Sequence, residues 1–274
     1  MALVEDPAIV CREASWLDWT LASAEVRTFV TDKFEDYARV FHPAAREATE
    51  ADLRRHRVHG LSDQEFLQPR PPCGVLWCEV SWSEVAEANG KVAHAAMQWS
   101  AVSEAKRSDE SLVWDQAPQF DSLPRRQTRV LSQILAQFTS TPASCWFAVW
   151  EGYGDLVGLS AGREIPRIAL PGRSMFLSHG PLTAVSLTSF SDPGHGPMVA
   201  DGYRSPSLWW PADRAWCVAT DVEFDSTCLG ASRACVAAVT SDKRLEAMRI
   251  NARQSIAGDA DLINAPRMQE RNRN

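Results

Sequence analysis

The chain has 274 residues, of which 45% are hydrophobic and 23% are charged, and its formal net charge is −7. A chain of this length can bury a substantial core, and this composition excludes a disordered protein. The acidic balance argues against sequence-independent nucleic-acid binding, which needs clustered Lys and Arg, and no apolar run approaches the roughly 20 residues that span a bilayer. We therefore expect neither a nucleic-acid partner nor a membrane partner.

The N-terminus and the cysteines indicate the compartment. The first residues include Glu5 and Asp6 and do not form a basic start followed by an apolar core, so we expect no secretory signal and a cytoplasmic protein. The seven cysteines are then expected to stay thiols. Cys73 and Cys78 have no second matching pair, and no His-Glu-x-x-His motif occurs. The sequence predicts neither a metal site nor a cofactor.

The first third of the chain is predicted to be helical and polar. Apolar residues recur at spacings of three and four over residues 15–41, which predicts an amphipathic helix that Pro43 stops and that can be broken near Thr31 and Asp32. Residues 44–72 are polar and are interpreted as a loop or short helix followed by an extended connector. A serine at the start and a glycine at the end of residues 81–90 predict a short helix.

The middle of the chain changes from helix to strands. Residues 100–124 are interpreted as a surface segment, and the apolar stripe over 128–138 predicts the clearest helix. After Pro142 the hydrophobic period becomes 2. This pattern predicts strands over residues 145–151, 165–170, 174–178, 183–190 and 216–224.

Two helices, over 232–239 and 242–250, are predicted to follow the strands. Because the links between strands are too short for helical crossovers, the order predicts an α+β fold with a mostly antiparallel central sheet and helices from the N- and C-terminal portions. No long linker separates two cores, so we expect a single domain over 1–256 and a polar, disordered tail over 257–274.

The strand predicted at 216–224 carries the first candidate site. Its apolar residues alternate with polar ones, so Asp221 and Glu223 are expected to share one exposed face of a strand. Two carboxylates in this geometry can hold a cation or act as an acid–base pair. The structural interpretation, a solvent-facing strand of an antiparallel sheet, is favoured over the catalytic one.

Aromatic residues just before this strand suggest a binding surface. Trp209 and Trp210 are adjacent, so their side chains point in opposite directions on an extended segment, and we expect one of them to be exposed or at an interface. Asp213 and Arg214 follow at the turn. Aromatic and arginine side chains dominate interface energies, which favours protein binding here.

Two histidines are weak catalytic candidates. His42 is placed at the end of the predicted first helix, where the helix dipole would favour the imidazolium and make it a proton donor. His195 lies in a glycine-flanked loop that could reach a pocket. A helix-capping histidine and an exposed loop histidine are the favoured interpretations. No Gly-x-Ser-x-Gly, Walker or Gly-x-Gly-x-x-Gly signature occurs.

Three stretches carry a family resemblance: residues 37–43 (YARVFHP), 145–152 (CWFAVWEG) and 209–227 (WWPADRAWCVATDVEFDST). Through them the chain resembles a group of uncharacterised, tryptophan-rich actinobacterial proteins, from which no activity can be transferred. The order of helices, sheet and aromatic residues is also similar, at the level of topology, to immunity and interaction proteins of the SMI1/KNR4 type.

Two hypotheses follow from the sequence. The leading one is a cytoplasmic, non-enzymatic binding or protein-interaction module, immunity-like. Its aromatic and acidic surface is expected around Trp209, Trp210, Asp213, Arg214, Asp221 and Glu223. The alternative is a hydrolase or metal-assisted enzyme whose pocket gathers the carboxylates of Asp221 and Glu223 with the two histidines. The sequence leaves the oligomeric state open.

Overall fold

The computed structural model describes residues 1–17, 24–52, 68–69, 76–104, 113–153, 156, 164–170, 172–186 and 203–264. The elements over these residues, in chain order, are β1 (Ala2–Leu3), α1 (Pro7–Ala14), α2 (Arg27–Val30), β2 (Asp36–Phe41), β3 (Ala44–Glu47), β4 (Gln68–Pro69), β5 (Leu76–Val80), α5 (Trp82–Ala88), α6 (Trp99–Val102), α7 (Arg125–Leu135), η1 (Ala136–Phe138), β6 (Cys145–Trp150), β7 (Arg167–Leu170), β8 (Arg173–Gly180), η3 (Leu182–Ser186), β9 (Leu208–Pro211), β10 (Trp216–Ala219), β11 (Ser226–Ala231), α8 (Arg233–Ser241) and β12 (Ala247–Ile250).

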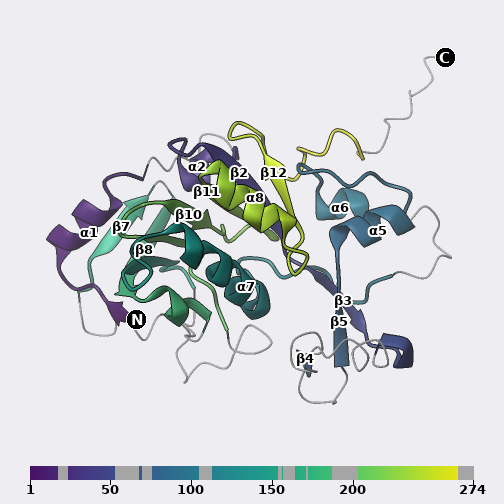
Figure 1. Ribbon diagram of the computed structural model, residues 1–274, viewed down its shortest axis with the longest axis horizontal. Helices are drawn as coiled ribbons and strands as arrows, with labels where there is room; N and C mark the ends of the chain where they lie inside the picture. The colour runs from purple at the N-terminus through teal and green to yellow at the C-terminus, as the bar shows by residue number, and fades with distance from the viewer. Residues whose placement is uncertain are drawn as a thin grey trace.

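Nine of the strands form one sheet in the order β1-β8-β6-β9-β10-β11-β2-β12, with β7 paired to β8 beside β1 (Figure 1). A second, three-stranded sheet has the order β3-β5-β4. Every strand pair among the described residues is antiparallel. The predicted α+β fold with a mostly antiparallel sheet is confirmed.

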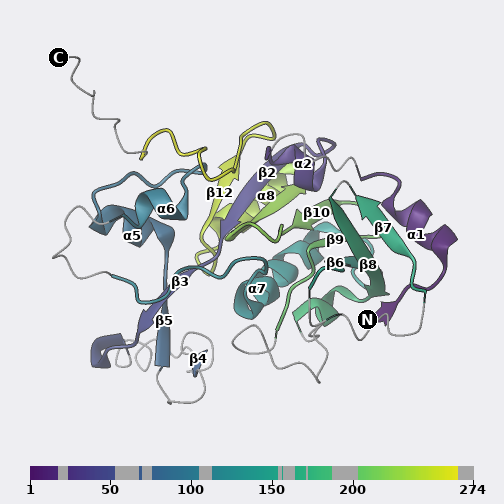
Figure 2. The same ribbon diagram turned by 180° about the vertical axis from the view of Figure 1, so that it is seen from behind.

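Helical segments cover both faces of the nine-stranded sheet. On one face, residues of α1 and α2 such as Val10 and Phe29 share a buried cluster with Trp210 and Cys217. On the other face, α7 and α8 pack on the sheet through a second cluster, and they lie in front of it in Figure 1 and behind it in Figure 2. The sheet therefore has no broad solvent-facing side in the described part of the chain.

A smaller lobe projects from one side of the sheet and contains β3, β5, α5 and α6 (Figure 1). The chain enters it directly from β2, through His42 and Pro43. A separate buried cluster fills it, with Trp82 at its centre and Trp99 packed beside Trp82 at a ring distance of 5.5 Å. The lobe therefore has its own core, while Phe41 and Met248 connect that core to the main sheet.

Helices with local start signals were predicted correctly. The helix expected over 81–90 is α5, whose capping box joins Ser81 and Glu84 through hydrogen bonds in both directions. Gly90 ends this turn with a φ of 60°, a conformation that favours glycine. Ser232 caps α8 by accepting a hydrogen bond from the backbone N–H of Cys235. The helix expected over 128–138 from its apolar stripe is α7 continued by η1.

Three predicted elements are wrong. The helix expected over 15–41 is replaced by α2 and β2, with residues 18–23 outside the described part. Five of the six residues of β2 are buried, and a strand buried on both faces is apolar without alternation, which allowed its residues to match a helical period. The helix expected over 242–250 ends in β12. The first part of the strand expected over 183–190 lies in η3, and residues 187–190 lie outside the described part.

The packed region extends beyond the boundary predicted at residue 257. Asp261 and Asn264 are buried, and Asn264 exchanges two hydrogen bonds with the backbone of Val92. Residues 265–274 of the predicted tail lie outside the described residues. In the part of the chain that the structure describes, no helix is both long and apolar enough to cross a membrane.

Candidate functional site

The strand that was expected to present acidic side chains is shorter than predicted and enclosed. β10 ends at Ala219, and none of its four residues is more than 2% exposed. Trp216 and Val218 face the cluster under α7 and α8, whereas Cys217 and Ala219 face the opposite cluster. The alternation predicted from the sequence exists, but helices cover both faces, so the predicted acidic face is wrong.

Asp221 and Glu223 lie in the turn after β10 and share one cation. The guanidinium of Arg173, on β8, donates two hydrogen bonds of 3.1 Å to the Asp221 carboxylate and one of 3.3 Å to Glu223. Asp221 is buried, while the Glu223 side chain is 75% exposed. Both carboxylates thus form ion pairs with Arg173, which closes the turn.

His42 is buried away from solvent and is neutral. Its Nδ1 donates to the carbonyl of Gln119 at 2.7 Å, and its Nε2 accepts from the Thr227 hydroxyl at 2.9 Å. Burial lowers the pKa of His42 to about 4. The expectation of a cationic histidine at a helix end is wrong, since the residue follows a strand. His195 lies outside the described residues.

The two adjacent tryptophans are both fully buried. Trp209 packs edge-on against Trp216 at a ring distance of 5.3 Å, whereas Trp210 packs against Trp16 at 5.9 Å. Their side chains do point in opposite directions, as predicted, but each direction leads into a core. The expectation that one of them is exposed is therefore wrong, and the predicted aromatic surface is not formed.

Asp213 and Arg214 stabilise the turn between β9 and β10. The Asp213 carboxylate accepts hydrogen bonds from the backbone and hydroxyl of Ser140 and from the Thr139 hydroxyl, which ties this turn to the end of η1. Arg214 has a φ of 55° and places its guanidinium 5.5 Å from the ring of Trp16. These contacts account for both residues structurally, and their proposed role in binding is not tested by them.

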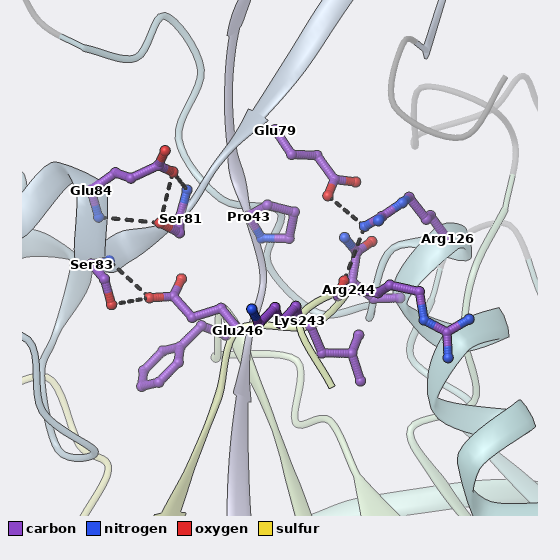
Figure 3. A pocket seen from close by; sticks show the side chains of 12 residues that line it. Pro43, Glu79, Ser81, Ser83, Glu84, Arg126, Lys243, Arg244 and Glu246 are labelled. Carbon is purple, nitrogen blue, oxygen red and sulfur yellow. Dashed lines mark hydrogen bonds and ion pairs between the residues drawn. The ribbon is translucent and has the colours of Figure 1, made fainter. Parts of the chain in front are cut away.

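A hollow of about 540 Å³ lies where the smaller lobe meets the main sheet (Figure 3). Four segments line it, at residues 41–43, 79–84, 126–127 and 243–246. They come from β2, the β5–α5 junction, the start of α7 and the loop before β12. Sequence reasoning missed this site because no contiguous motif marks it; its side chains come together only through the tertiary fold.

The charged groups inside the hollow are held by bonds between the lobe and the main body. Arg126 of α7 donates to the Glu79 carboxylate of β5 at 2.8 Å (Figure 3). Glu246 accepts from the backbone N–H of Trp82 at 2.6 Å and from the backbone and hydroxyl of Ser83 at 2.8 and 2.6 Å. These carboxylates are thus fixed in position before any ligand arrives.

Both fixed carboxyls are perturbed by their surroundings. Burial raises the pKa of Glu79, and the neighbouring Arg126 offsets only part of that effect. Burial likewise raises the pKa of Glu246, against the opposing effect of its hydrogen bonds from Ser83 and Trp82. Each carboxyl therefore takes up a proton at a higher pH than an exposed glutamate does.

The rim of the hollow presents exposed charge of both signs. Glu84, on α5, and Lys243, before β12, are exposed lining residues labelled in Figure 3. Lys243 has no ion-pair partner in the part of the chain that the structure describes. Charged side chains at the mouth of a polar hollow are suited to bind a ligand that carries complementary charges.

Neither the possible metal ligands nor the comparisons with known proteins assign a function to these residues. No group of three or more His, Cys, Asp or Glu residues within the described ranges could hold a metal ion. The six described cysteines are free thiols. No protein-family model matches the sequence, and no curated protein and no solved structure matches it, so the two resemblances stay predictions.

Proposed function

We propose that this protein is a non-enzymatic, protein-binding module of an immunity-like kind, and that it receives a polar segment of its partner in the hollow between the smaller lobe and the main sheet. The observation that carries the proposal is the hollow itself, with fixed carboxylates inside and exposed charges at its rim. Binding at this place replaces the surface predicted around Trp209 and Trp210, which are buried.

Preorganisation favours binding over catalysis. Glu79 and Glu246 already accept hydrogen bonds that hold the lobe against the sheet, so they lose little side-chain freedom when a ligand arrives. A general acid or base would instead have to release these bonds during its reaction. Polar groups that are fixed in advance give specificity to a contact and add little to its entropic cost.

The test compares two charge reversals on α5. Glu84→Arg changes the rim of the hollow, and Glu87→Arg makes the same change on an exposed residue of the same helix that does not line it. Proteins retained by the wild-type chain are identified, purified and titrated against both variants. We expect Glu84→Arg to weaken binding by about tenfold, as for one lost charge-assisted contact, and Glu87→Arg to leave it unchanged.

Equal affinities of the partner for the two variants would contradict the proposal. Because Glu84 also belongs to the capping box of α5, the thermal unfolding of both variants is compared first, and we expect a loss of about 1 kcal/mol for Glu84→Arg. The titrations are then made at a temperature at which both variants are folded.

A hydrolase acting in the same hollow is the second candidate, and the raised pKa values of Glu79 and Glu246 favour it. In this case Glu79, whose side chain is 27% exposed, would act as the general acid. The wild-type chain is tested on chromogenic esters, amides and glycosides against Glu79→Gln. An activity that falls by about 100-fold in Glu79→Gln supports the enzyme, and an activity that is unchanged contradicts it.

A further inference from the structure

The outer edge of β12 has backbone groups without partners among the residues that the structure describes. Within these residues β12 pairs only with β2, in the register Ala247↔Val40 to Ile250↔Tyr37. The N–H of Phe41 donates to the carbonyl of Glu246 at 2.9 Å, which makes that pair a hydrogen-bonded one. Because such pairs alternate in an antiparallel ladder, Met248 and Ile250 direct their backbone groups to β2, whereas Ala247 and Arg249 direct theirs away from it.

The neighbouring strand supports this assignment. On its other side, β2 uses the opposite set of residues, since the N–H of His42 donates to the carbonyl of Asp225 across the pair with β11. In the described part of the chain, the backbone groups that Ala247 and Arg249 direct away from β2 form no hydrogen bond with any other segment. Among the described residues, the N–H and C=O of both residues therefore have no partner at the sheet edge.

The far edge of the same sheet is formed by two strands and has a helix packed near it. There β7 and β1 both pair with β8, and α1 packs against β7. β12 is short and has the exposed Arg249 in it, two features that keep an edge strand from pairing indiscriminately. A partner that pairs here must therefore add side-chain contacts of its own to four backbone hydrogen bonds.

An exposed cation lies on each side of β12 in the sequence. Lys243 precedes it and Arg253 follows it, and neither has an ion-pair partner among the described residues. Arg249 and Arg244, by contrast, are paired with Asp36 and Asp242. The two exposed charges without an ion pair that precede and follow β12 in the sequence are thus both positive, whereas the Glu246 carboxylate next to Ala247 is held by hydrogen bonds from Trp82 and Ser83.

We propose that an extended, acidic segment of a partner protein adds a strand to the edge of β12, pairing with Ala247 and Arg249 and placing its carboxylates against Lys243 and Arg253. Strand addition takes its affinity from backbone hydrogen bonds and its specificity from the flanking side chains. The inference rests on the proposed function in that the partner is a protein. Lys243 also lines the hollow, whereas Ala247 and Arg249, which supply the backbone hydrogen bonds, do not.

The probe is a short blocked peptide, Glu-Val-Thr-Val-Glu. Its binding is monitored through the amide chemical shifts and the hydrogen exchange of the full chain. We expect the amides of Ala247 and Arg249 to shift and to become protected, with those of Met248 and Ile250 changed less. Two control peptides, Lys-Val-Thr-Val-Lys and a backbone N-methylated Glu-Val-Thr-Val-Glu, are expected to bind about tenfold more weakly or not at all.

A matched pair of variants separates the backbone contact from the side chain. Arg249→Pro removes the outward N–H and keeps the pairing of Met248 and Ile250 with β2, whereas Arg249→Ala keeps the N–H and removes only the guanidinium. We expect Arg249→Pro to weaken peptide binding by about tenfold more than Arg249→Ala does. If Arg249→Pro does not fold, the N-methylated peptide tests the same hydrogen bonds on the wild-type chain.

Several results would overturn the inference. They are equal affinities of the acidic and N-methylated peptides, shifts that leave Ala247 and Arg249 unchanged, and protection of these amides by dimerisation of the chain alone. Glu84→Arg is expected to bind the peptide like the wild type. A loss of partner binding in Glu84→Arg with peptide binding intact would support the hollow independently of the edge.

Discussion

Two polar regions of this molecule lie close together in sequence and differ in their access to solvent. The enclosed cluster comprises Arg39, His42, Asp225 and Thr227, at the end of β2 and the start of β11, whereas the hollow contains Glu79 and Glu246. Both regions combine perturbed carboxyls with cations, but only the hollow offers space to a ligand. Residue type and a perturbed pKa therefore do not identify a functional site until access is known.

Arg39 is held mainly by contacts inside the enclosed cluster, although its Nη2 has no hydrogen-bond partner among the described residues. It is 0% exposed, donates to the Ser226 hydroxyl at 2.8 Å and to the Met97 carbonyl at 2.7 Å, and lies 4.8 Å from the ring of Phe41. Burial lowers its pKa to about 10, so it stays a cation at neutral pH. Its role is to connect β2 with β11 and with the loop that leads to α6.

Removal of Arg39 is expected to have the largest effect. Arg39→Ala leaves the buried Asp225 without its nearest cation, at 4.0 Å, and leaves two carbonyls unpaired, so we expect a loss of about 3–5 kcal/mol in the free energy of unfolding. Urea unfolding measures it. The matched control is Arg249→Ala, whose side chain is 59% exposed and whose removal should cost less than about 1 kcal/mol. Similar losses for both variants would contradict the enclosure of Arg39.

The next effect is the dependence of stability on pH through His42. Its folded pKa, about 4, lies below its unfolded value near 6.5, so its neutral form stabilises the fold above pH 6.5 and this contribution is lost as pH falls towards 4. The full difference corresponds to about 3 kcal/mol. Urea unfolding between pH 7 and pH 4.5 should show a shallower loss in His42→Gln than in the wild type. Parallel pH profiles would show that His42 is not enclosed as described.

The effect of Glu246→Gln is expected to be smaller, because the hollow tolerates solvent. The amide keeps one acceptor oxygen, so one of the donors from Trp82 and Ser83 loses its partner, and we expect a loss of about 1–2 kcal/mol. Thermal unfolding measures it, with the exposed Glu87→Gln as the matched change on α5. If Glu246→Gln were as neutral as Glu87→Gln, the carboxylate would not anchor the lobe.

Elements with local signals could be predicted from the sequence, and elements buried on both sides could not. The stripe of α7 and the capping serines of α5 and α8 are readable because each depends on neighbours within one or two turns. β2 was predicted as a helix because long-range packing on two faces removes the visible difference between a strand and a buried helix. β10 was predicted as a strand, but the helices that cover its second face could not be predicted, so its acidic face was wrong.

The candidate site shows the same limit more strongly. Asp221 and Glu223 were singled out for their spacing, but the residue that decides their role is Arg173, on a distant strand. The hollow needs four segments between residues 41 and 246, joined by pairs such as Glu79 with Arg126. Such pairs form only after the chain has folded, and no spacing rule along the sequence encodes them.

Carboxylate footprinting tests the central claim, that the hollow and not the enclosed cluster meets the partner. The full chain is labelled with a carbodiimide and an amine nucleophile, with and without a captured partner, and the labelled residues are read by mass spectrometry. We predict that Glu84 and Glu79 are labelled in the free chain and protected by the partner, while Asp221 and Asp225 stay unlabelled throughout. Unchanged labelling of Glu79 and Glu84 in the complex, with protection at Glu223 instead, would contradict the account.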